Sequence, residues 1–305
     1  MGFTKEFNKL VTEERNERTM DLDTLDTVEL VERVQAEDFE VAKAVQQVIP
    51  EIAKAIDIIT DRLRQGGKLI YFGAGTSGRL GVLDAAECVP TFGIEKAVVQ
   101  AYIAGGRDAM FQSFEDAEDQ KELGIQDALH AKLTEKDVVV GVSSSGRTPY
   151  VIGALAQAKE LGAAVISVVN NPDSTLSSDS DVTIAALVGP EALTGSTRMK
   201  SGSAQKMILN LISTCTMVRL GKVYENLMID LKPTNYKLRE RAVSIISILG
   251  SVPRQLAEGA LVASHDKCKT AILMMKRKMG RAQAEELITK CGGSLRKALV
   301  ADPNQ

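Results

Sequence analysis

The residues best suited to chemistry in this sequence lie in a glycine-rich turn, Gly73–Arg79, which we call turn A. A short apolar run, Lys68–Phe72, precedes the turn, and a segment compatible with a helix follows it. Glycine allows a sharp backbone turn and a close approach of a ligand to the main chain. The amide groups that open a helix can bind an anion without a cationic side chain. Turn A therefore favours a phosphate, with Gly75, Thr76 and Ser77 as its ligands.

The glycine spacing in turn A also fits the dinucleotide pattern G-x-G-x-x-G, at Gly73, Gly75 and Gly78. A dinucleotide fold places an acidic residue about 20 residues further on, at the end of the second strand, where it binds ribose hydroxyls. The expected second strand, 97–103, runs instead into Ala104 and two glycines and carries no carboxylate. A phosphorylated small molecule is therefore favoured over a dinucleotide.

A second turn of the same design, Ser143–Pro149 or turn B, follows another apolar strand. Ser143, Ser145 and Thr148 supply hydroxyls, and Pro149 stands near the first turn of the helix expected next. Either turn alone could be an ordinary strand–helix connection with a capping serine. Two such turns on alternating units would both lie at the carboxyl edge of a parallel sheet, where ligands of open α/β folds bind. Together they predict a sugar-phosphate site.

The elements that must hold these turns alternate between helices and strands. Helical periodicity extends from Thr27 to Arg64, where Pro50 starts a new helix and two glycines end it. The expected strands, all short and rich in β-branched residues, are 68–72, 97–103, 137–142, 164–169 and 182–186. This alternation predicts an α/β fold in which helices cover both faces of a parallel sheet.

The chain is expected to become wholly helical towards its C-terminus. A long helix is predicted at Met199–Leu220 and a small helical bundle from about Tyr236 onwards. We therefore divide the chain into an N-terminal helical segment packing on the main domain, 1–66, an α/β phosphosugar-binding domain, 67–235, and a C-terminal helical bundle, 236–305. A length of 305 residues suits one main domain with such an appendage.

Composition excludes several classes of protein. The formal net charge of −3 gives no electrostatic reason to expect a nucleic-acid partner, and no apolar run approaches the roughly 20 residues that span a bilayer. The segment Met1–Met20 is too polar for a secretory signal. Cys88, Cys215, Cys268 and Cys291 lack the C-x-x-C spacing of zinc sites and suggest no disulfide framework. A cytoplasmic protein with reduced thiols, no membrane partner and no metal is expected.

Histidine is too scarce for several catalytic designs. The two histidines, His130 and His265, lie outside any glycine-rich or acidic cluster, which argues against a Ser-His-Asp hydrolase and against most zinc enzymes. Proton transfer must then fall mainly to carboxylates, lysines or tyrosines. Lys200 and Lys206 could approach a substrate, although a solvated helix lysine is the more common outcome.

Several further motifs accompany the two turns. They are Gly73–Gly81, Asp84–Glu87, Pro90–Gly93, Ile103–Gly106, Ala117–Asp119, Ser145–Tyr150 and Thr194–Gly202, with Thr12–Asn16 and Thr24–Asp26 near the N-terminus. In these motifs the chain resembles the N-acetylmuramic acid 6-phosphate etherases, a family of the sugar-isomerase-domain superfamily, over nearly its whole length. The block that begins at Thr194 is particularly specific, because generic sugar-isomerase domains lack it.

The resemblance implies both an architecture and a reaction. It implies a sugar-isomerase-type domain with a five-stranded parallel sheet flanked by helices, a C-terminal helical domain similar to ubiquitin-associated modules, and a homodimer. The reaction cleaves the lactyl ether at C3 of N-acetylmuramic acid 6-phosphate to give D-lactate and N-acetylglucosamine 6-phosphate. It needs no cofactor.

Elimination chemistry explains how two carboxyl groups suffice for this cleavage. In the ring-opened sugar the C2 proton is alpha to the C1 aldehyde, so a carboxylate can remove it. The oxygen at C3 then leaves as lactate once an acid protonates it, and water adds at C3. By the family motif the two carboxyl groups are those of Glu87 and Glu118. We favour Glu87 as the acid and Glu118 as the base, and the reverse assignment stays open at the level of sequence. Without the resemblance, Glu87 would be read as a helix-end residue and Glu118 as one of several surface acids.

The spacing between turn A and Glu87 has a geometric consequence. Ser77 and Glu87 are ten residues apart, which is about 15 Å along a continuous helix and exceeds the comfortable reach from the phosphate to C2 of one hexose. Either the helix breaks before Glu87, or Glu87 serves the phosphate turns of a partner subunit. A site shared across a dimer is our preferred hypothesis.

Two other functions remain open at the level of sequence. An aldose–ketose sugar-phosphate isomerase also removes a C2 proton with a carboxylate, but it releases no lactate. A sugar-phosphate-binding regulator, similar to the glucokinase regulatory protein, would bind its ligand and a partner without chemistry. The presence of both Glu87 and Glu118 favours catalysis.

Overall fold

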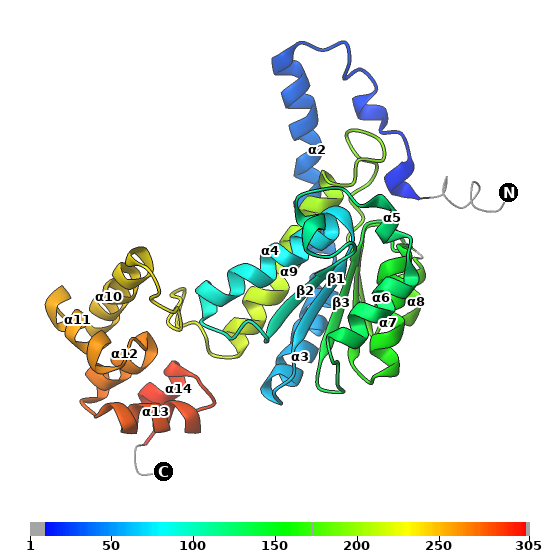
Figure 1. Ribbon diagram of the computed structural model, residues 1–305. Helices are drawn as coiled ribbons and strands as arrows, with labels where there is room; N and C mark the ends of the chain where they lie inside the picture. Colours follow the sequence, from blue (N-terminus) through cyan, green and yellow to red (C-terminus); the bar gives the residue numbers. More distant parts are fainter. Residues whose placement is uncertain (1–9, 173, 303–305) are drawn as a thin grey trace. The chain divides into compact units, whose positions relative to one another are not determined.

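Figure 1 shows the computed structural model of the protein, which describes residues 10–172 and 174–302. The chain packs as two units, which we call the sheet unit and the helical unit. The sheet unit comprises Met1–Ala85 and Ala97–Ser213, and the helical unit comprises Ala86–Lys96 and Thr214–Gln305. The division into two units has other boundaries than the three segments expected from the sequence, 1–66, 67–235 and 236–305. The three-segment organisation stays a prediction.

The sheet unit is built on five parallel strands in the order β2-β1-β3-β4-β5. Their bounds are β1 (Leu69–Gly73), β2 (Val99–Ile103), β3 (Val138–Ser143), β4 (Ala164–Val169) and β5 (Val182–Ala185). The predicted α/β fold is confirmed, and each predicted strand lies within two residues of an observed one. Every residue of β1, β3 and β4 is buried, as expected for central strands covered on both faces.

Helices of the sheet unit cover both sides of these strands, except that α2 extends away from the sheet (Figure 1). They are α2 (Thr27–Gln47), α3 (Ile49–Arg64), α4 (Gly75–Phe92), α5 (Glu115–Glu118), α6 (Lys121–His130), α7 (Pro149–Glu160), α8 (Thr175–Asp179) and α9 (Lys200–Arg219), of which α4 and α9 continue into the helical unit. One face of the sheet holds a core in which Phe72 stacks on Tyr102 with ring centroids 5.1 Å apart and in which Tyr150 of α7 is fully buried.

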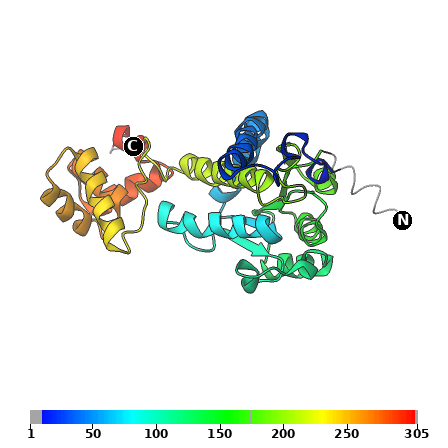
Figure 2. The ribbon, with the colours of Figure 1, turned by 90° about the horizontal axis from the view of Figure 1, so that it is seen from above.

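The helical unit has a hydrophobic core of its own. Figure 2 shows its helices, coloured yellow to red, gathered into one bundle. They are α10 (Tyr236–Gly250), α11 (Arg254–Ala263), α12 (Cys268–Arg277), α13 (Arg281–Lys290) and α14 (Leu295–Val300). Ile246 of α10 and Leu273 of α12 are among its fully buried side chains. Across the described parts of the chain, no helix has the length and apolar character needed to cross a membrane.

A buried carboxylate on α2 joins distant segments of the sheet unit. Glu37 is 2 % exposed. Its Oε2 accepts from Lys200 Nζ at 2.7 Å and from Asn16 Nδ2 at 2.7 Å, and its Oε1 accepts from Arg18 Nε at 2.6 Å. Burial alone would raise the pKa of this carboxyl, but the hydrogen bonds from Arg18, Lys200 and Asn16 outweigh burial and lower the pKa to about 2. The network fixes the N-terminal segment against the start of α9.

The position of Lys200 corrects the expectation of a solvated helix lysine. The side chain is 0 % exposed and its ammonium is paired with Glu37, because a charge this deeply buried needs a partner. The main-chain amides of Lys200 and Ser201 donate to the buried Glu191 carboxylate at 2.8 and 2.9 Å. The Glu191 carboxylate thus accepts from the first amides of α9, so the start of this helix is not available to bind the phosphate of a ligand. Lys206 is exposed.

We expect Glu37→Gln to flatten the acid dependence of stability. The pKa of Glu37 in the folded state, about 2, lies below its ordinary value of 4.5, so its stabilisation is complete above pH 4.5 and is lost as the pH falls towards 2. The free energy of unfolding of the wild type should drop by roughly 1–3 kcal/mol over this range because of Glu37. Urea unfolding at several pH values measures this loss.

Glu32→Gln, at an exposed position of the same helix, controls for the loss of one carboxylate. This control should retain the wild-type acid dependence. An unchanged acid dependence in Glu37→Gln would contradict the role given to the buried network.

Candidate functional site

Turns A and B lie side by side at one edge of the sheet. The register pairs Gly73 at the end of β1 with Val142 of β3, so both strands deliver their turns at the same level. From this point the chain runs from β1 to β2 on one side, while β3 is followed by β4 on the other. Such a topological switch point is where ligands of open α/β sheets bind. The structure therefore brings together the two turns that the sequence predicted.

Two positions of turn A favour glycine, Gly73 for lack of space and Gly75 for its backbone conformation. A Cβ on Gly73 would lie 2.6 Å from the Gly78 nitrogen, and Gly75 has φ of +51°, a conformation that favours glycine. Helix α4 begins at Gly75, so its first amides have no acceptor inside the helix and are available to an anion. Thr76 is half-buried beside them, and its methyl group lies 3.3 Å from where a Cβ on Gly202 would be.

Turn B is held by its own hydroxyl groups. Ser143 Oγ lies 2.8 Å from Thr148 Oγ1 and accepts from the Gly146 amide at 3.1 Å. Ser145 Oγ lies 3.4 Å from Ser143 Oγ and accepts from the Arg147 amide at 3.2 Å. Ser143 is buried, whereas Ser145 and Thr148 are half-buried. The three predicted hydroxyl residues therefore form one cluster, in which Ser143 stabilises the turn and the other two are closer to solvent.

A glutamine outside both turns connects them. Gln205 of α9 accepts a hydrogen bond from Ser77 Oγ at 2.8 Å and donates to Ser144 Oγ at 2.9 Å. Its Nε2 also donates to Asn170 Oδ1 at 3.0 Å. Sequence reasoning did not select this residue, although it lies inside the specific block Thr194–Lys206. The available signal was the position of a glutamine within an otherwise buried stretch of helix, since a buried amide needs hydrogen-bond partners.

Glu118 stands at the end of the short helix α5. The preceding segment is held by Arg79 of turn A, whose guanidinium donates to Met110 O at 3.3 Å and to Gln112 O at 2.8 Å. Glu118 is an exposed residue, yet loss of hydration raises the pKa of its carboxyl, and the negative charges of Asp119 and Glu115 raise this pKa further. A carboxylate with a raised pKa is a stronger base than an ordinary glutamate, which suits proton abstraction.

Glu87 lies on the same helix as turn A. Helix α4 runs without a break from Gly75 to Phe92, so the first of the two alternatives drawn from the sequence, a helix break before Glu87, is not observed. The Glu87 side chain is exposed.

One turn earlier on α4, Asp84 is buried and accepts from Tyr71, Asn210 and Ser213 at 2.9, 2.7 and 3.0 Å. Burial raises the pKa of Asp84, while these hydrogen bonds oppose the rise. Asp84 thus holds α4 in place against β1 and α9.

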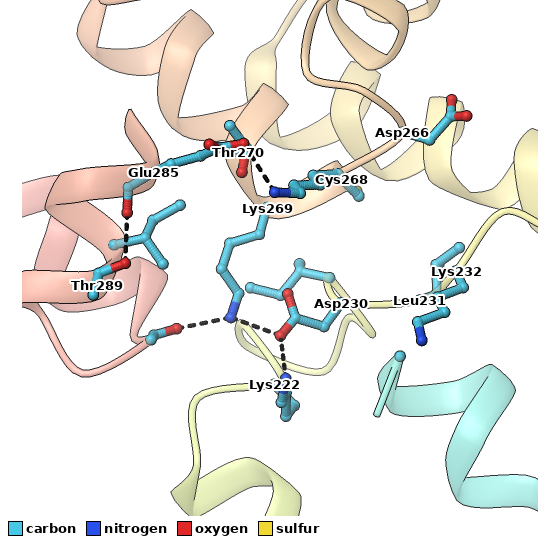
Figure 3. Close-up of a pocket in the computed structure, with 15 residues that line it drawn as sticks. Lys222, Asp230, Leu231, Lys232, Asp266, Cys268, Lys269, Thr270, Glu285 and Thr289 are labelled. Atoms are coloured by element: carbon cyan, nitrogen blue, oxygen red, sulfur yellow. Dashed lines mark hydrogen bonds and ion pairs between the residues drawn. The ribbon is translucent and has the colours of Figure 1, made fainter. Parts of the chain in front are cut away.

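The helical unit contains a cavity of about 540 Å³, which Figure 3 shows in close-up. Lys269 Nζ donates to Asp230 Oδ2 at 2.8 Å and to Gly293 O at 2.7 Å, and Lys222 Nζ lies 3.1 Å from the same carboxylate oxygen (Figure 3). These ammonium groups are therefore partnered within the unit. None of the residues that line the cavity belongs to the predicted site.

The described residues contain no group of three or more histidine, cysteine, aspartate and glutamate side chains arranged to hold a metal ion.

Known proteins resemble this chain at two levels. Family models of the glucokinase regulatory protein N-terminal SIS domain and of the SIS domain match residues 51–159 and 114–214. Over 295 residues the chain is 49 % identical to N-acetylmuramic acid 6-phosphate etherase of Clostridioides difficile, with 97 % of both chains covered. Over 290 residues it is 51 % identical to N-acetylmuramic acid 6-phosphate etherase 2 of Vibrio cholerae, with 95 % of this chain and 94 % of that one covered.

A solved structure agrees with the fold of the sheet unit. A Bacteroides fragilis protein described as a phosphosugar isomerase involved in capsule formation superimposes with a TM-score of 0.50 at 24 % identity. The match covers 66 % of this chain and 95 % of the Bacteroides protein. The predicted sugar-isomerase-type fold, a five-stranded parallel sheet flanked by helices, is confirmed.

We expect Gly146→Ala to damage turn B more than backbone strain alone explains. Gly146 has φ of +66°, and a Cβ there would lie 2.2 Å from Ser174 Cβ. Strain and overpacking should together lower the free energy of unfolding by roughly 2–4 kcal/mol and weaken the binding of a sugar phosphate. Chemical denaturation and calorimetric titration measure the two effects.

Gly189→Ala is the matched control. Gly189 has φ of +71°, and a Cβ there would have no atom within 4 Å, so its substitution should cost only about 1 kcal/mol. Equal losses in the two variants would mean that the contact between turn B and Ser174 does not matter.

Proposed function

Because this chain belongs to the N-acetylmuramic acid 6-phosphate etherase family, we propose that it cleaves the C3 lactyl ether of N-acetylmuramic acid 6-phosphate. The products are N-acetylglucosamine 6-phosphate and D-lactate, which makes the protein a carbon–oxygen lyase. The observation that carries the proposal is identity of about half of all residues to two etherases across nearly the whole chain. The two adjacent turns at the switch point of the sheet support a phosphosugar as the substrate.

In the proposed mechanism, Glu118 starts the reaction as a base. Its carboxylate takes the C2 proton of the ring-opened sugar, and the electron pair of that C–H bond forms an enolate across C1 and C2. The raised pKa of Glu118 suits a base that has to take a weakly acidic proton. The buried core behind α5 keeps this helix in place, because Ala117 packs in the same cluster as Tyr150.

Glu87 completes the elimination as an acid. The enolate electrons return to form a C2–C3 double bond, the C3–O bond breaks, and Glu87 gives its proton to the leaving lactate oxygen. Water then adds at C3 of the unsaturated aldehyde, and C2 regains a proton. Every step is a proton transfer, an elimination or an addition, so the sequence of steps requires neither a metal nor a redox cofactor.

The phosphate is assigned to turns A and B. Gly75, Thr76 and Ser77 offer the amides that open α4 together with the Thr76 hydroxyl, and Ser143, Ser145 and Thr148 form the hydroxyl cluster of turn B. Neutral donors and main-chain dipoles can hold a dianion at a helix start. These donors carry no full positive charge, so they do not stabilise the ionised form of Glu118. The Glu118 carboxylate therefore keeps its tendency to take up a proton.

We assign the active site to a homodimer in which Glu87 serves the turns of the partner subunit. The unbroken helix α4 supports this assignment, since about 15 Å of helix separates Ser77 from Glu87. Helix α2 also exposes large apolar side chains: Val28 is 66 %, Val31 62 % and Phe39 65 % exposed. Such exposed apolar side chains on one helix fit an interaction surface, and we propose that a second copy of the chain covers them. Cytoplasmic location remains the expectation from the sequence.

D-lactate release from N-acetylmuramic acid 6-phosphate tests the reaction and its base. Wild-type protein should release one lactate per sugar, and Glu118→Gln should lower kcat by about 10²- to 10⁴-fold, the usual contribution of a general base. Glu115→Gln, which removes another acid of the same short helix, should keep kcat within a few-fold of the wild type. Tight sugar-phosphate binding with no lactate from the wild type would instead favour the regulator.

Mixed dimers test the sharing of the site. A Glu87→Gln chain paired with a Thr76→Val chain contains one fully intact site if Glu87 acts on the partner's turns, so such heterodimers should recover about half of the wild-type rate. Each homodimer should be nearly inactive. Purification through two different affinity tags confirms that heterodimers have formed. Inactive heterodimers would show that each chain uses its own Glu87.

A further inference from the structure

We propose that Gln205 is a positioning residue that fixes the distance between turns A and B and selects which of their hydroxyls face the phosphate. This inference rests on the proposed function, which gives both turns one phosphate to hold. Gln205 is 0 % exposed and belongs to neither turn, so it acts on the ligand through other residues.

The side chain of Gln205 uses its hydrogen-bonding capacity on three partners from three segments. Its Oε1 accepts from Ser77 of turn A at 2.8 Å. Its Nε2 donates to Ser144 of turn B at 2.9 Å and to Asn170, directly after β4, at 3.0 Å. An amide nitrogen has two protons, and both are used. One rigid amide group therefore spans the gap between the two turns.

The orientation of this amide is set by a second amide behind it. Asn170 Nδ2 donates to the main-chain oxygen of Ala186 at 2.9 Å, so Asn170 Oδ1 must face Gln205. An oxygen there requires the nitrogen of Gln205 as its partner, which leaves Gln205 Oε1 facing Ser77. Because that oxygen can only accept, the Ser77 hydroxyl must donate to it.

The two serines held by Gln205 consequently have different roles. A hydroxyl has one proton, and the Ser77 hydroxyl donates its proton to the hydrogen bond with Gln205. The donors that turn A offers to the phosphate are therefore the Thr76 hydroxyl and the main-chain amides, including that of Ser77. Ser144 Oγ accepts a hydrogen bond from Gln205 Nε2, so the Ser144 hydroxyl proton remains available for donation. Ser144 is half-buried, and it joins Ser145 and Thr148 as a phosphate donor of turn B.

Gln205→Met tests the bridge. Methionine has nearly the length of glutamine but cannot hold the three partners, so the turns lose their fixed separation. We expect the KM for N-acetylmuramic acid 6-phosphate to rise about tenfold or more and kcat to stay within about threefold. If Gln205 only stabilised the fold, the substitution would lower the amount of folded protein and leave the KM of the folded fraction unchanged.

Gln205→Glu adds a readout that depends on pH. When protonated, the new carboxyl can accept from Ser77 and donate to one of the other partners; when ionised, it can only accept and places a negative charge near the phosphate. Its KM, divided by that of the wild type at each pH, should therefore fall as the pH is lowered from 8 to 5.5. This normalisation removes the titration of the substrate phosphate itself. Gln205→Met should show no such fall.

Thr216→Val is the matched control on the same helix. Thr216 is fully buried and its hydroxyl has no hydrogen-bond partner, so this substitution removes a buried polar atom of α9 without touching either turn. It should leave KM at the wild-type value.

An unchanged KM in a folded Gln205→Met variant, or an equal rise in Thr216→Val, would overturn the role of Gln205. If Gln205→Met does not fold, the normalised pH profile of Gln205→Glu decides, and a flat profile overturns the inference. Lactate release by the wild type is measured before the variants are compared. Its failure would overturn the proposed function, whereas the results above bear on Gln205 alone.

Discussion

Three polar side chains fix helix α9 in the sheet unit, because each of them bonds to a particular distant partner. Lys200 pairs with Glu37 of α2, Gln205 bridges the two turns, and Asn210 donates to Asp84 of α4. Leaving any of these groups buried without its partner would cost on the order of 1–3 kcal/mol or more. A shift of α9 by one residue would break all of these contacts together. The geometry of the site therefore depends on polar groups that do not take part in the proposed chemistry.

The same constraint explains how the site can hold a doubly charged group with neutral donors. Turns A and B already have defined positions because the parallel register of β1 and β3 delivers them at one level. Gln205 then fixes their separation, so the amides of α4 and the hydroxyls of turn B need little rearrangement to bind phosphate. Loss of hydration and the negative charges of Asp119 and Glu115 keep the pKa of Glu118 raised. Binding and proton transfer are thus assigned to different kinds of groups.

The sequence predicted the strands, the long helices and both turns, because these depend on local periodicity and on glycine and proline. The burial of Lys200 could not be predicted, since its partner Glu37 is 163 residues away in the sequence and no local pattern marks the pair. The role of Gln205 was missed for the same reason, and so was the donor role of the Ser77 hydroxyl, which is set by an amide beyond the turn. The assignment of Glu87 and Glu118 came from the family resemblance rather than from spacing.

Reaction in ¹⁸O-labelled water tests the central claim, elimination at C3 followed by addition of water, most directly. If the C3–O bond of the sugar breaks, the solvent oxygen enters at C3, and mass spectrometry should find ¹⁸O in N-acetylglucosamine 6-phosphate and none in the ether-derived hydroxyl of lactate. The same experiment in deuterated water should place deuterium at C2 of the sugar product. Label in that lactate hydroxyl, with an unlabelled C3, would show that the lactyl carbon is attacked instead and would contradict the roles given to Glu118 and Glu87.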